Sequence, residues 1–227
     1  MLFTPYPSPF TLNPMTRLIL IRHGETLWNT ERRMQGQQDS PLTERGVWQA
    51  RCLGERLKTL AFTALYSSDL GRALRTAQGI AQATGHAIVE DARLRERHFG
   101  VFEGMTRAEM QAHDPEIYDR FLARDPHYAL PGGESPAAFF ERCRAALEEL
   151  AARHAGATIA VVTHGLVLDC AWRAATGLAL EAPRPVPLVN ASLNWFACDG
   201  GRWSAQCWGD ADHLGPDGVT VFADGSV

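Results

Sequence analysis

The stretch that decides the fold is Leu-Ile-Leu-Ile-Arg-His-Gly-Glu-Thr at residues 18–26. Its four consecutive apolar residues predict a strand that is buried on both faces of a parallel sheet. Arg22 and His23 follow at once, so a guanidinium and an imidazole are expected at the carboxyl end of the strand, where open α/β sheets bind ligands. Gly24 removes the side chain at the turn, which allows a ligand to approach the backbone closely. A cation beside a histidine indicates an anion site in which the histidine is a nucleophile or a proton carrier.

A second segment, late in the chain, has the same construction. Residues 158–163, Thr-Ile-Ala-Val-Val-Thr, predict another buried strand, and His164 and Gly165 follow it directly. A single Arg-His-Gly would be a weak signal, but a second strand that ends in His-Gly makes the interpretation of an anion site strong.

Predicted helices alternate with predicted strands along the rest of the chain. Strands are expected over residues 17–21, 64–66, 86–89 and 158–163. Helices are expected from Thr43 to Leu60 and over 70–84, 107–113, 115–123, 136–155 and 166–176, with a terminal hairpin over 192–197 and 203–208. This alternation predicts a three-layer α/β/α sandwich, in which a mostly parallel sheet carries helices on both faces.

Composition narrows the class of protein. The chain has 227 residues, a net charge of −4 and five cysteines. A mildly acidic chain without clustered lysine and arginine argues against a nucleic-acid or membrane-surface protein. The cysteines are odd in number and widely spaced, so we expect reduced thiols in the cytoplasm rather than disulfides or a zinc site.

Composition and regularity also suggest how the chain is divided. Residues 1–14 contain four prolines and no charge, and they are expected to form a non-catalytic N-terminal extension. Residues 15–227 are expected to form a single domain. Its least regular part, residues 99–131, is expected to cap the active site and select the substrate.

Three motifs resemble those of the histidine phosphatase superfamily, in its branch 1 or phosphoglycerate mutase-like group. They are Arg-His-Gly-Glu-Thr at 22–26, Ser-Asp-Leu-Gly-Arg-Ala at 68–73 and His-Gly at 164–165. The resemblance covers residues 16 to about 214, which is nearly the whole chain. It implies phosphoryl transfer through a phosphohistidine.

Phosphoryl transfer needs a nucleophile, cations around the phosphate oxygens and an acid for the leaving oxygen. His23 is the expected nucleophile, with the Gly24 backbone holding its other ring nitrogen by resemblance to the family. Glu96 is the expected general acid and base, which requires a raised pKa. Arg22 and Arg72 are expected to bind the phosphate with paired hydrogen bonds. The resemblance implies that His164 is the second histidine, which binds phosphate as a cation.

Weaker candidates surround this set. Asn29 and Gln35 resemble family positions that donate hydrogen bonds to the phosphate, and Gly24 and Arg107 are candidate substrate-binding residues. Glu90 and Asp91 are alternatives to Glu96 from the same region, but they lie outside its motif, Leu-Arg-Glu-Arg-His-Phe-Gly at residues 94–100. Other polar residues are expected to be structural or non-catalytic: Arg75, residues 133–135, His98, His113, His127 and His213.

Two activities compete within the resemblance. Water accepts the phosphoryl group in a phosphomonoesterase, whereas the substrate accepts it back in a cofactor-dependent phosphoglycerate mutase. The chain has Phe99 where true mutases have tyrosine, and it has only the separated Arg120 and Arg124 where mutases have adjacent arginines. These differences favour a phosphatase. Asp169 stands where both groups usually have arginine, which weakens the transfer of detailed substrate contacts from either group. Arg107 could bind a substrate carboxylate, so the mutase stays an alternative.

A third alternative is a non-catalytic phosphate-binding module, which would require neither a nucleophile nor an acid. We expect no metal and no cofactor, except a 2,3-bisphosphoglycerate primer if the protein is a mutase. The expected partner is a small phosphorylated substrate, and the protein is expected to be a monomer or a homodimer.

Overall fold

A computed structural model describes residues 14–218 of the chain, without the side chains of residues 216 and 217. The predicted N-terminal extension therefore lies outside the described residues, apart from Pro14. Within the described part, no helix is both long and apolar enough to cross a bilayer.

The core of the fold is one six-stranded sheet. In spatial order its strands are β3 (Ile88–Glu90), β2 (Leu65–Ser67), β4 (Thr158–Thr163), β1 (Thr16–Arg22), β5 (Leu193–Asp199) and β6 (Arg202–Asp210). Strands β3, β2, β4 and β1 are parallel to one another. At the other edge, β5 pairs antiparallel with β1, and β6 pairs antiparallel with β5. This confirms the predicted mostly parallel sheet and its terminal hairpin.

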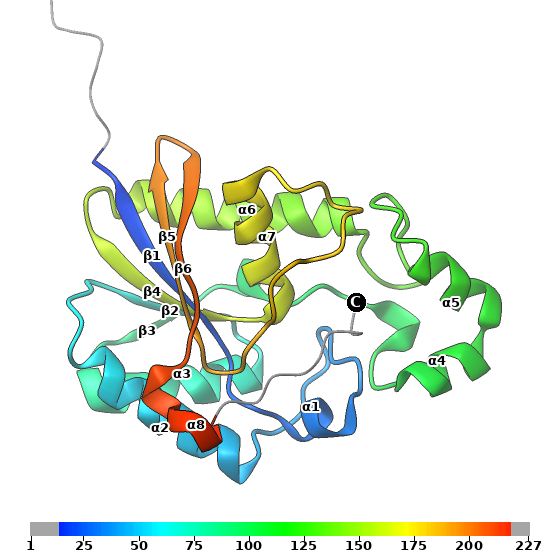
Figure 1. Ribbon diagram of the computed structural model, residues 1–227, viewed down its shortest axis with the longest axis horizontal. Coiled ribbons are helices and arrows are strands. Elements are labelled where there is room, and N and C mark those ends of the chain that lie inside the picture. The colour runs from blue at the N-terminus through cyan, green and yellow to red at the C-terminus, as the bar shows by residue number, and fades with distance from the viewer. Residues whose placement is uncertain (1–13, 219–227) are drawn as a thin grey trace, which may run out of the picture.

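Helices cover both faces of the sheet (Figure 1). One face packs against α6 (Pro136–Arg153) and α7 (Gly165–Thr176), and the other packs against α2 (Glu44–Leu57) and α3 (Gly71–Thr84). The central strand contributes to both cores, because Leu18 and Leu20 belong to the first and Ile19 and Ile21 to the second, each without exposed surface. The predicted three-layer sandwich is therefore confirmed.

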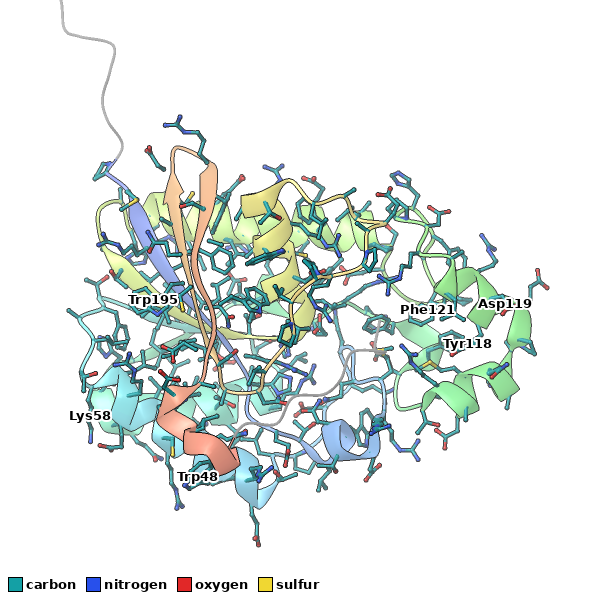
Figure 2. All side chains as sticks on the ribbon, viewed as in Figure 1. Trp48, Lys58, Tyr118, Asp119, Phe121 and Trp195 are labelled. Carbon is teal, nitrogen blue, oxygen red and sulfur yellow. The ribbon has the colours of Figure 1, made fainter. Side chains whose placement is uncertain are left out.

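A third, smaller core lies outside the sheet. It joins Phe99, Phe102, Met110, Tyr118 and Leu130, from the segment that contains α4 (Arg107–His113) and α5 (Pro115–Leu122). These helices stand at one end of the molecule in Figure 1. In Figure 2, Phe121 lies on the side of α5 nearer the sheet and the exposed Asp119 on the far side. The remaining helical turns are α1 (Leu27–Glu31), α8 (Gly215–Gly218), and 3₁₀ turns at Ala92–Leu94, Gly100–Phe102 and Asp212–Leu214.

Two local differences from the sequence prediction have clear causes. Strand β3 begins at Ile88 rather than at His86, because His86 is held against Phe62 instead. Their ring centroids are 4.0 Å apart, and His86 Nε2 lies 3.0 Å from the Phe62 carbonyl oxygen. Helix α1 was not predicted, because it is too short for a helical period. It is nucleated by a capping box between Thr26 and Asn29.

The aromatic residues of the terminal hairpin pack on the sheet. Phe196 is fully buried, and its ring lies 6.3 Å from both Trp203 and Trp208. Trp195 packs against the core on the opposite face. The alternation of these side chains along β5 therefore joins both layers to the edge of the sheet.

Candidate active site

The register of the two central strands brings the two histidines together. Arg22 lies beside Thr163 in the parallel ladder, and the His23 N–H donates to the Thr163 carbonyl at 3.0 Å. His23 and His164, which follow β1 and β4 directly, therefore lie at the same edge of the sheet. Their ring centroids are 5.3 Å apart. The common edge follows from parallel pairing and not from any local motif.

One ring nitrogen of His23 is held by the backbone. Its Nδ1 lies 2.8 Å from the Gly24 carbonyl oxygen, which can only accept, so Nδ1 carries the hydrogen and Nε2 keeps a free lone pair. Burial, together with the positive charges of Arg72 and Arg22, lowers the pKa of His23 well below its usual value. A neutral imidazole with a free Nε2 is the form that can attack phosphorus.

His164 has a different environment. Its Nε2 lies 2.8 Å from the Ser68 hydroxyl, and its Nδ1 is buried without a hydrogen-bond partner in the part of the chain that the structure describes. Burial, Arg72 and His23 lower the pKa of His164 well below its usual value. An unpartnered buried ring nitrogen is costly, so an arriving anion would give it both a partner and a reason to be protonated.

Two arginines also present unpartnered donors. Arg22 donates from Nη1 to the Leu188 carbonyl at 2.7 Å. Arg72 donates to the carbonyls of Gly36 and Gln38, each at 2.7 Å. The Nε atoms of both arginines are buried and have no hydrogen-bond partner among residues 14–218. Burial lowers the pKa of Arg22 to about 10, which leaves it charged at neutral pH, so these donors favour an anion.

Glu96 is buried between two backbone donors. Its Oε1 accepts from the Arg97 N–H at 2.8 Å, and its Oε2 accepts from the Leu166 N–H at 3.1 Å. Burial raises the pKa of Glu96 despite these hydrogen bonds and despite Arg72 and Arg22, all of which lower it. The carboxyl group therefore holds its proton to a higher pH than an exposed glutamate, as a general acid requires.

His23, Arg22, Arg72 and Glu96 line one cleft of about 680 Å³, whereas His164 is fully buried and is not among the lining residues. Seven of the predicted site residues line it: Arg22, His23, Asn29, Gln35, Arg72, Glu96 and Arg107. Asn29 Oδ1 already accepts from the Thr26 N–H at 3.1 Å, so its amide NH₂ is the group left for a ligand. Gln35 Oε1 is buried without a partner, and a rotated amide would place a donor there.

Gly24 holds the His23 ring nitrogen as expected, and it also has a packing role that the sequence did not indicate. A Cβ atom here would come 2.7 Å from the Gly46 carbonyl oxygen at the start of α2. Its N–H donates to Thr76 Oγ1 at 3.0 Å, and its carbonyl accepts from His23. Glycine is required here for helix packing, and a contact between Gly24 and substrate stays a prediction.

Two positioning residues were missed. Ser68 is the partner of His164, although it was visible only as the first residue of a motif. Glu103 accepts from the N–H groups of Gln37 at 2.8 Å, Gln38 at 3.1 Å and Phe99 at 2.9 Å. Glu103 thereby holds the loop whose carbonyls bind Arg72.

Asp169 belongs to an ion pair. Its Oδ2 accepts from Arg173 Nε at 2.8 Å, one helical turn further along α7, and both side chains are buried. The arginine that the family usually has here is replaced by a carboxylate that holds another arginine. In the described residues, no group of three or more His, Cys, Asp or Glu is placed to hold a metal ion, and independence of metals stays a prediction.

The residues expected to be structural have structural contacts. Glu134 accepts from the His98 N–H at 3.0 Å and pairs with Arg142 at 2.8 Å, and Ser135 caps α6. Arg75 bonds only to Gln78, at 3.3 Å, on the exposed side of α3.

The fold and this site define a phosphoryl-transfer enzyme of the histidine type, and comparison with known proteins gives the family. The model of the histidine phosphatase superfamily (branch 1) matches residues 18–211, so the chain belongs to that superfamily. Probable phosphoglycerate mutase GpmB of Klebsiella pneumoniae is 41% identical over 206 residues, which are 88% of this chain and 95% of that protein.

Solved structures are similar over the same region. Bacillus stearothermophilus YhfR has 41% identity and a TM-score of 0.80, over 87% of this chain and 98% of that one. A mycobacterial glucosyl-3-phosphoglycerate phosphatase has 31% identity and a TM-score of 0.74, over 87% of this chain and 100% of that one. The relatives thus include both a phosphatase and a protein named as a mutase.

Proposed function

We propose that the protein is a phosphomonoesterase that hydrolyses a small phosphorylated metabolite through a phosphohistidine on His23. One observation carries the proposal. The rings of His164 and of a neutral His23 with a free Nε2 lie 5.3 Å apart, and Arg22 and Arg72 line the same cleft as His23. In the described part of the chain, the Nε atoms of both arginines and the Nδ1 atom of His164 are buried without a hydrogen-bond partner, so a phosphoryl group on His23 would bring negative charge to donors that lack one.

In the first step, Nε2 of His23 attacks phosphorus, and the bond between phosphorus and the leaving oxygen breaks. The leaving oxygen takes the proton of Glu96, so the alcohol departs neutral. Arg22, Arg72 and His164 stabilise the charge on the transferred group throughout. The Gly24 carbonyl keeps the Nδ1 hydrogen of His23 in place and stabilises the positive ring that forms.

In the second step, water attacks the phosphohistidine and the phosphorus–nitrogen bond breaks. Glu96, now a carboxylate, takes a proton from that water, and inorganic phosphate leaves. The enzyme returns to its first state with Glu96 protonated and His23 neutral. Each proton that Glu96 gives in the first step is recovered in the second.

A cofactor-dependent phosphoglycerate mutase is the second candidate. Two observations favour it: the name of the 41%-identical Klebsiella relative and the presence of Arg107 in the cleft, where it could bind a carboxylate. The phosphatase is favoured by Phe99 at the position of the mutases' tyrosine. The glucosyl-3-phosphoglycerate phosphatase among the similar structures also supports it.

The deciding experiment is metal-free turnover of a phosphomonoester panel beside 3-phosphoglycerate with a 2,3-bisphosphoglycerate primer. Both free phosphate and isomerised product are followed. Phosphate release without isomerisation supports the phosphatase, and primer-dependent isomerisation with little free phosphate overturns it. His23→Ala should lose turnover and keep the fold. Turnover that persists in this variant would exclude the phosphohistidine.

We also propose that the enzyme works in the cytoplasm without a metal or an organic cofactor. All five cysteines, Cys52, Cys143, Cys170, Cys198 and Cys207, are free thiols, which is typical of a reducing compartment. Dialysis against a chelator should leave turnover unchanged, because the proposed mechanism uses only side chains.

A further inference from the structure

Asn190 joins two residues of the candidate site. It lies between α7 and β5, it has no exposed surface, and it is not among the residues that line the cleft. Its amide nitrogen Nδ2 lies 2.9 Å from the His23 carbonyl oxygen and 3.3 Å from Asn29 Oδ1. An amide nitrogen carries two hydrogens, so each acceptor can receive one. One amide group thus contacts both the backbone of the proposed nucleophile and a side chain that lines the cleft.

The orientations of both amides follow from their partners. The His23 carbonyl can only accept, so Asn190 must face it with its nitrogen. The Thr26 N–H can only donate, and it lies 3.1 Å from Asn29 Oδ1. Asn29 must therefore face both Thr26 and Asn190 with its oxygen. Because two donors occupy Oδ1, the NH₂ group is what Asn29 offers to a phosphate oxygen in the cleft.

The next residue, Ala191, has an unfavourable backbone conformation. Its φ of 56° lies in the left-handed region, where a residue with a Cβ atom is strained. In this conformation the Ala191 N–H donates to the Arg22 carbonyl at 3.1 Å and to the His23 carbonyl at 3.3 Å. Strained backbone persists only where the surroundings hold it, and it is concentrated at functional sites. The strain at Ala191 accompanies the placement of Asn190 against the proposed nucleophile.

Packing alone does not explain an asparagine at this buried position. Asn190 Oδ1 is buried without a hydrogen-bond partner among the residues that the structure describes, which is costly. An apolar residue of similar volume would fill the space without that cost. Asn194, also buried, has partners for both ends of its amide: Oδ1 accepts from the Gly209 N–H at 2.8 Å, and Nδ2 donates to the Leu20 carbonyl at 3.2 Å. The two donors of Asn190 are therefore what its side chain supplies.

We propose that Asn190 is a positioning residue for phosphoryl transfer. It fixes the main chain of His23 at its carbonyl, and it turns the amide of Asn29 so that the NH₂ group donates to the phosphate. The first contact acts on kcat, because it holds the nucleophile in the geometry that the attack requires. The second contact acts on phosphate affinity. This inference rests on the proposed function, since it assumes that phosphate binds beside His23.

A double-mutant cycle between Asn190→Ala and Asn29→Ala tests the proposal. Calorimetric titration gives the affinity for inorganic phosphate, and turnover of 4-nitrophenyl phosphate gives kcat. Asn29→Ala should weaken phosphate binding by about tenfold, the loss of one hydrogen bond to a charged group. Asn190→Ala should weaken it by about three- to tenfold and lower kcat by about tenfold. When Asn29 is already alanine, Asn190→Ala should change affinity by less than about twofold but still lower kcat, because the contact with His23 is lost in either background.

Asn194→Ala is the matched control, because Asn194 is equally buried but bonds to no residue of the site. It should lower the free energy of unfolding about as much as Asn190→Ala, and it should leave phosphate affinity and kcat within about twofold of the wild type. Unchanged phosphate affinity and kcat in Asn190→Ala would overturn the proposal. Equal losses in Asn190→Ala and Asn194→Ala, or additive losses of affinity in the double variant, would overturn it as well.

NMR of the wild-type protein supplies a second test if Asn190→Ala does not fold. The side-chain NH₂ signals of Asn29, assigned by their absence from Asn29→Ala, should shift when inorganic phosphate is added. Unshifted signals would overturn the proposal. If the wild type neither hydrolyses a phosphomonoester nor binds phosphate, the proposed function fails and the inference fails with it. If the wild type does both and the variants do not behave as expected, the inference alone fails.

Discussion

Ser68 Oγ lies 2.8 Å from His164 Nε2, so a fully buried serine that does not line the catalytic cleft sets the orientation of the second histidine. The same hydroxyl accepts from the Leu70 N–H at 3.3 Å, which leaves its own hydrogen free to point at Nε2. That arrangement puts the His164 hydrogen on Nδ1, the buried nitrogen without a partner. Ser68 thus makes His164 a donor toward the phosphate site.

Ser68→Ala should lower kcat/KM by about five- to tenfold and weaken product inhibition by inorganic phosphate by a similar factor, because one hydrogen bond contributes about 1 kcal/mol. The measurement is steady-state kinetics with phosphate as inhibitor, over a range of pH. Ser68→Thr keeps the hydroxyl and should recover most of the loss. Ser67→Ala, whose hydroxyl bonds only to the Ser68 carbonyl, is the control. Equal losses in both alanine variants would show that the effect is merely structural.

Glu96→Gln should distinguish substrates by their leaving groups. An alkyl phosphate needs a proton on its leaving oxygen, so its kcat should fall by about 10²–10⁴-fold. 4-Nitrophenyl phosphate leaves readily as an anion, so its phosphorylation step should fall much less. Burst-phase kinetics measure the two steps separately, since loss of the base also slows hydrolysis of the phosphohistidine. A burst that is suppressed equally for both substrates would remove Glu96 as the acid.

The raised pKa of Glu96 also predicts the pH dependence of turnover. The acid is active when protonated, so kcat/KM for an alkyl phosphate should decline as pH rises through that pKa. His23 stays neutral through the same range because its pKa is lowered. An alkaline decline that survives in Glu96→Gln would have to come from another group.

The free energy of unfolding should fall as the pH is lowered, because His23 and His164 are buried. Their folded-state pKa values lie well below 6.5, so the unfolded chain binds more protons and stability is lost as pH falls below about 6.5. Each histidine contributes up to about 1.4 kcal/mol per pH unit. Glu96 acts in the opposite direction, because its raised pKa makes the folded state bind the extra proton. Because these two histidines outweigh the one glutamate, the free energy of unfolding decreases as the pH is lowered.

Urea unfolding in phosphate-free buffer between pH 5 and 7 measures this slope of about 1.4 kcal/mol per pH unit per histidine. His164→Gln should remove the share of one histidine, whereas His127→Gln, on the exposed surface, should leave the slope unchanged. A slope that is the same in all three proteins would mean that His164 is already protonated in the folded state. Saturating phosphate should stabilise the wild type by mass action.

Glu103→Gln should destabilise the protein by about 1–3 kcal/mol, because an amide cannot accept at both of its terminal atoms. The loop of residues 36–38 would loosen, and with it the carbonyls that hold Arg72, so inhibition by phosphate should weaken in parallel. Urea denaturation and inhibition constants measure the two effects. Glu141→Gln, an exposed position on α6, is the control. Loss of stability with unchanged phosphate affinity would separate Glu103 from the site.

The sheet and much of the site could be predicted because local signals carry them. The limits of β4 agree with the prediction at both ends, because its apolar run is bounded by polar residues. The short α4 also agrees, and it is held by a Thr106–Glu109 capping box that is readable in the sequence. His23 and His164 follow strands directly, so the rule for carboxyl edges of parallel sheets places them.

Ser68 and Glu103 could not be predicted because their roles depend on partners far away in the chain. His164 is 96 positions from Ser68, and Gln37 is 66 positions from Glu103. Neither residue has a local pattern that specifies a distant partner. The packing requirement at Gly24 was not predicted for the same reason, since the neighbour that excludes a Cβ atom there is Gly46 on another helix.

Glu103 has a consequence for protein engineering. It belongs to the segment that carries the cap, yet it holds the loop that positions Arg72 through the N–H groups of Gln37 and Gln38. A cap transplanted from a relative to change substrate range would therefore bring a foreign residue into contact with the phosphate loop. The exchangeable unit is a pair of segments, residues 99–131 together with 35–39, and chimaeras cut at the cap alone should lose catalysis before they gain a new substrate.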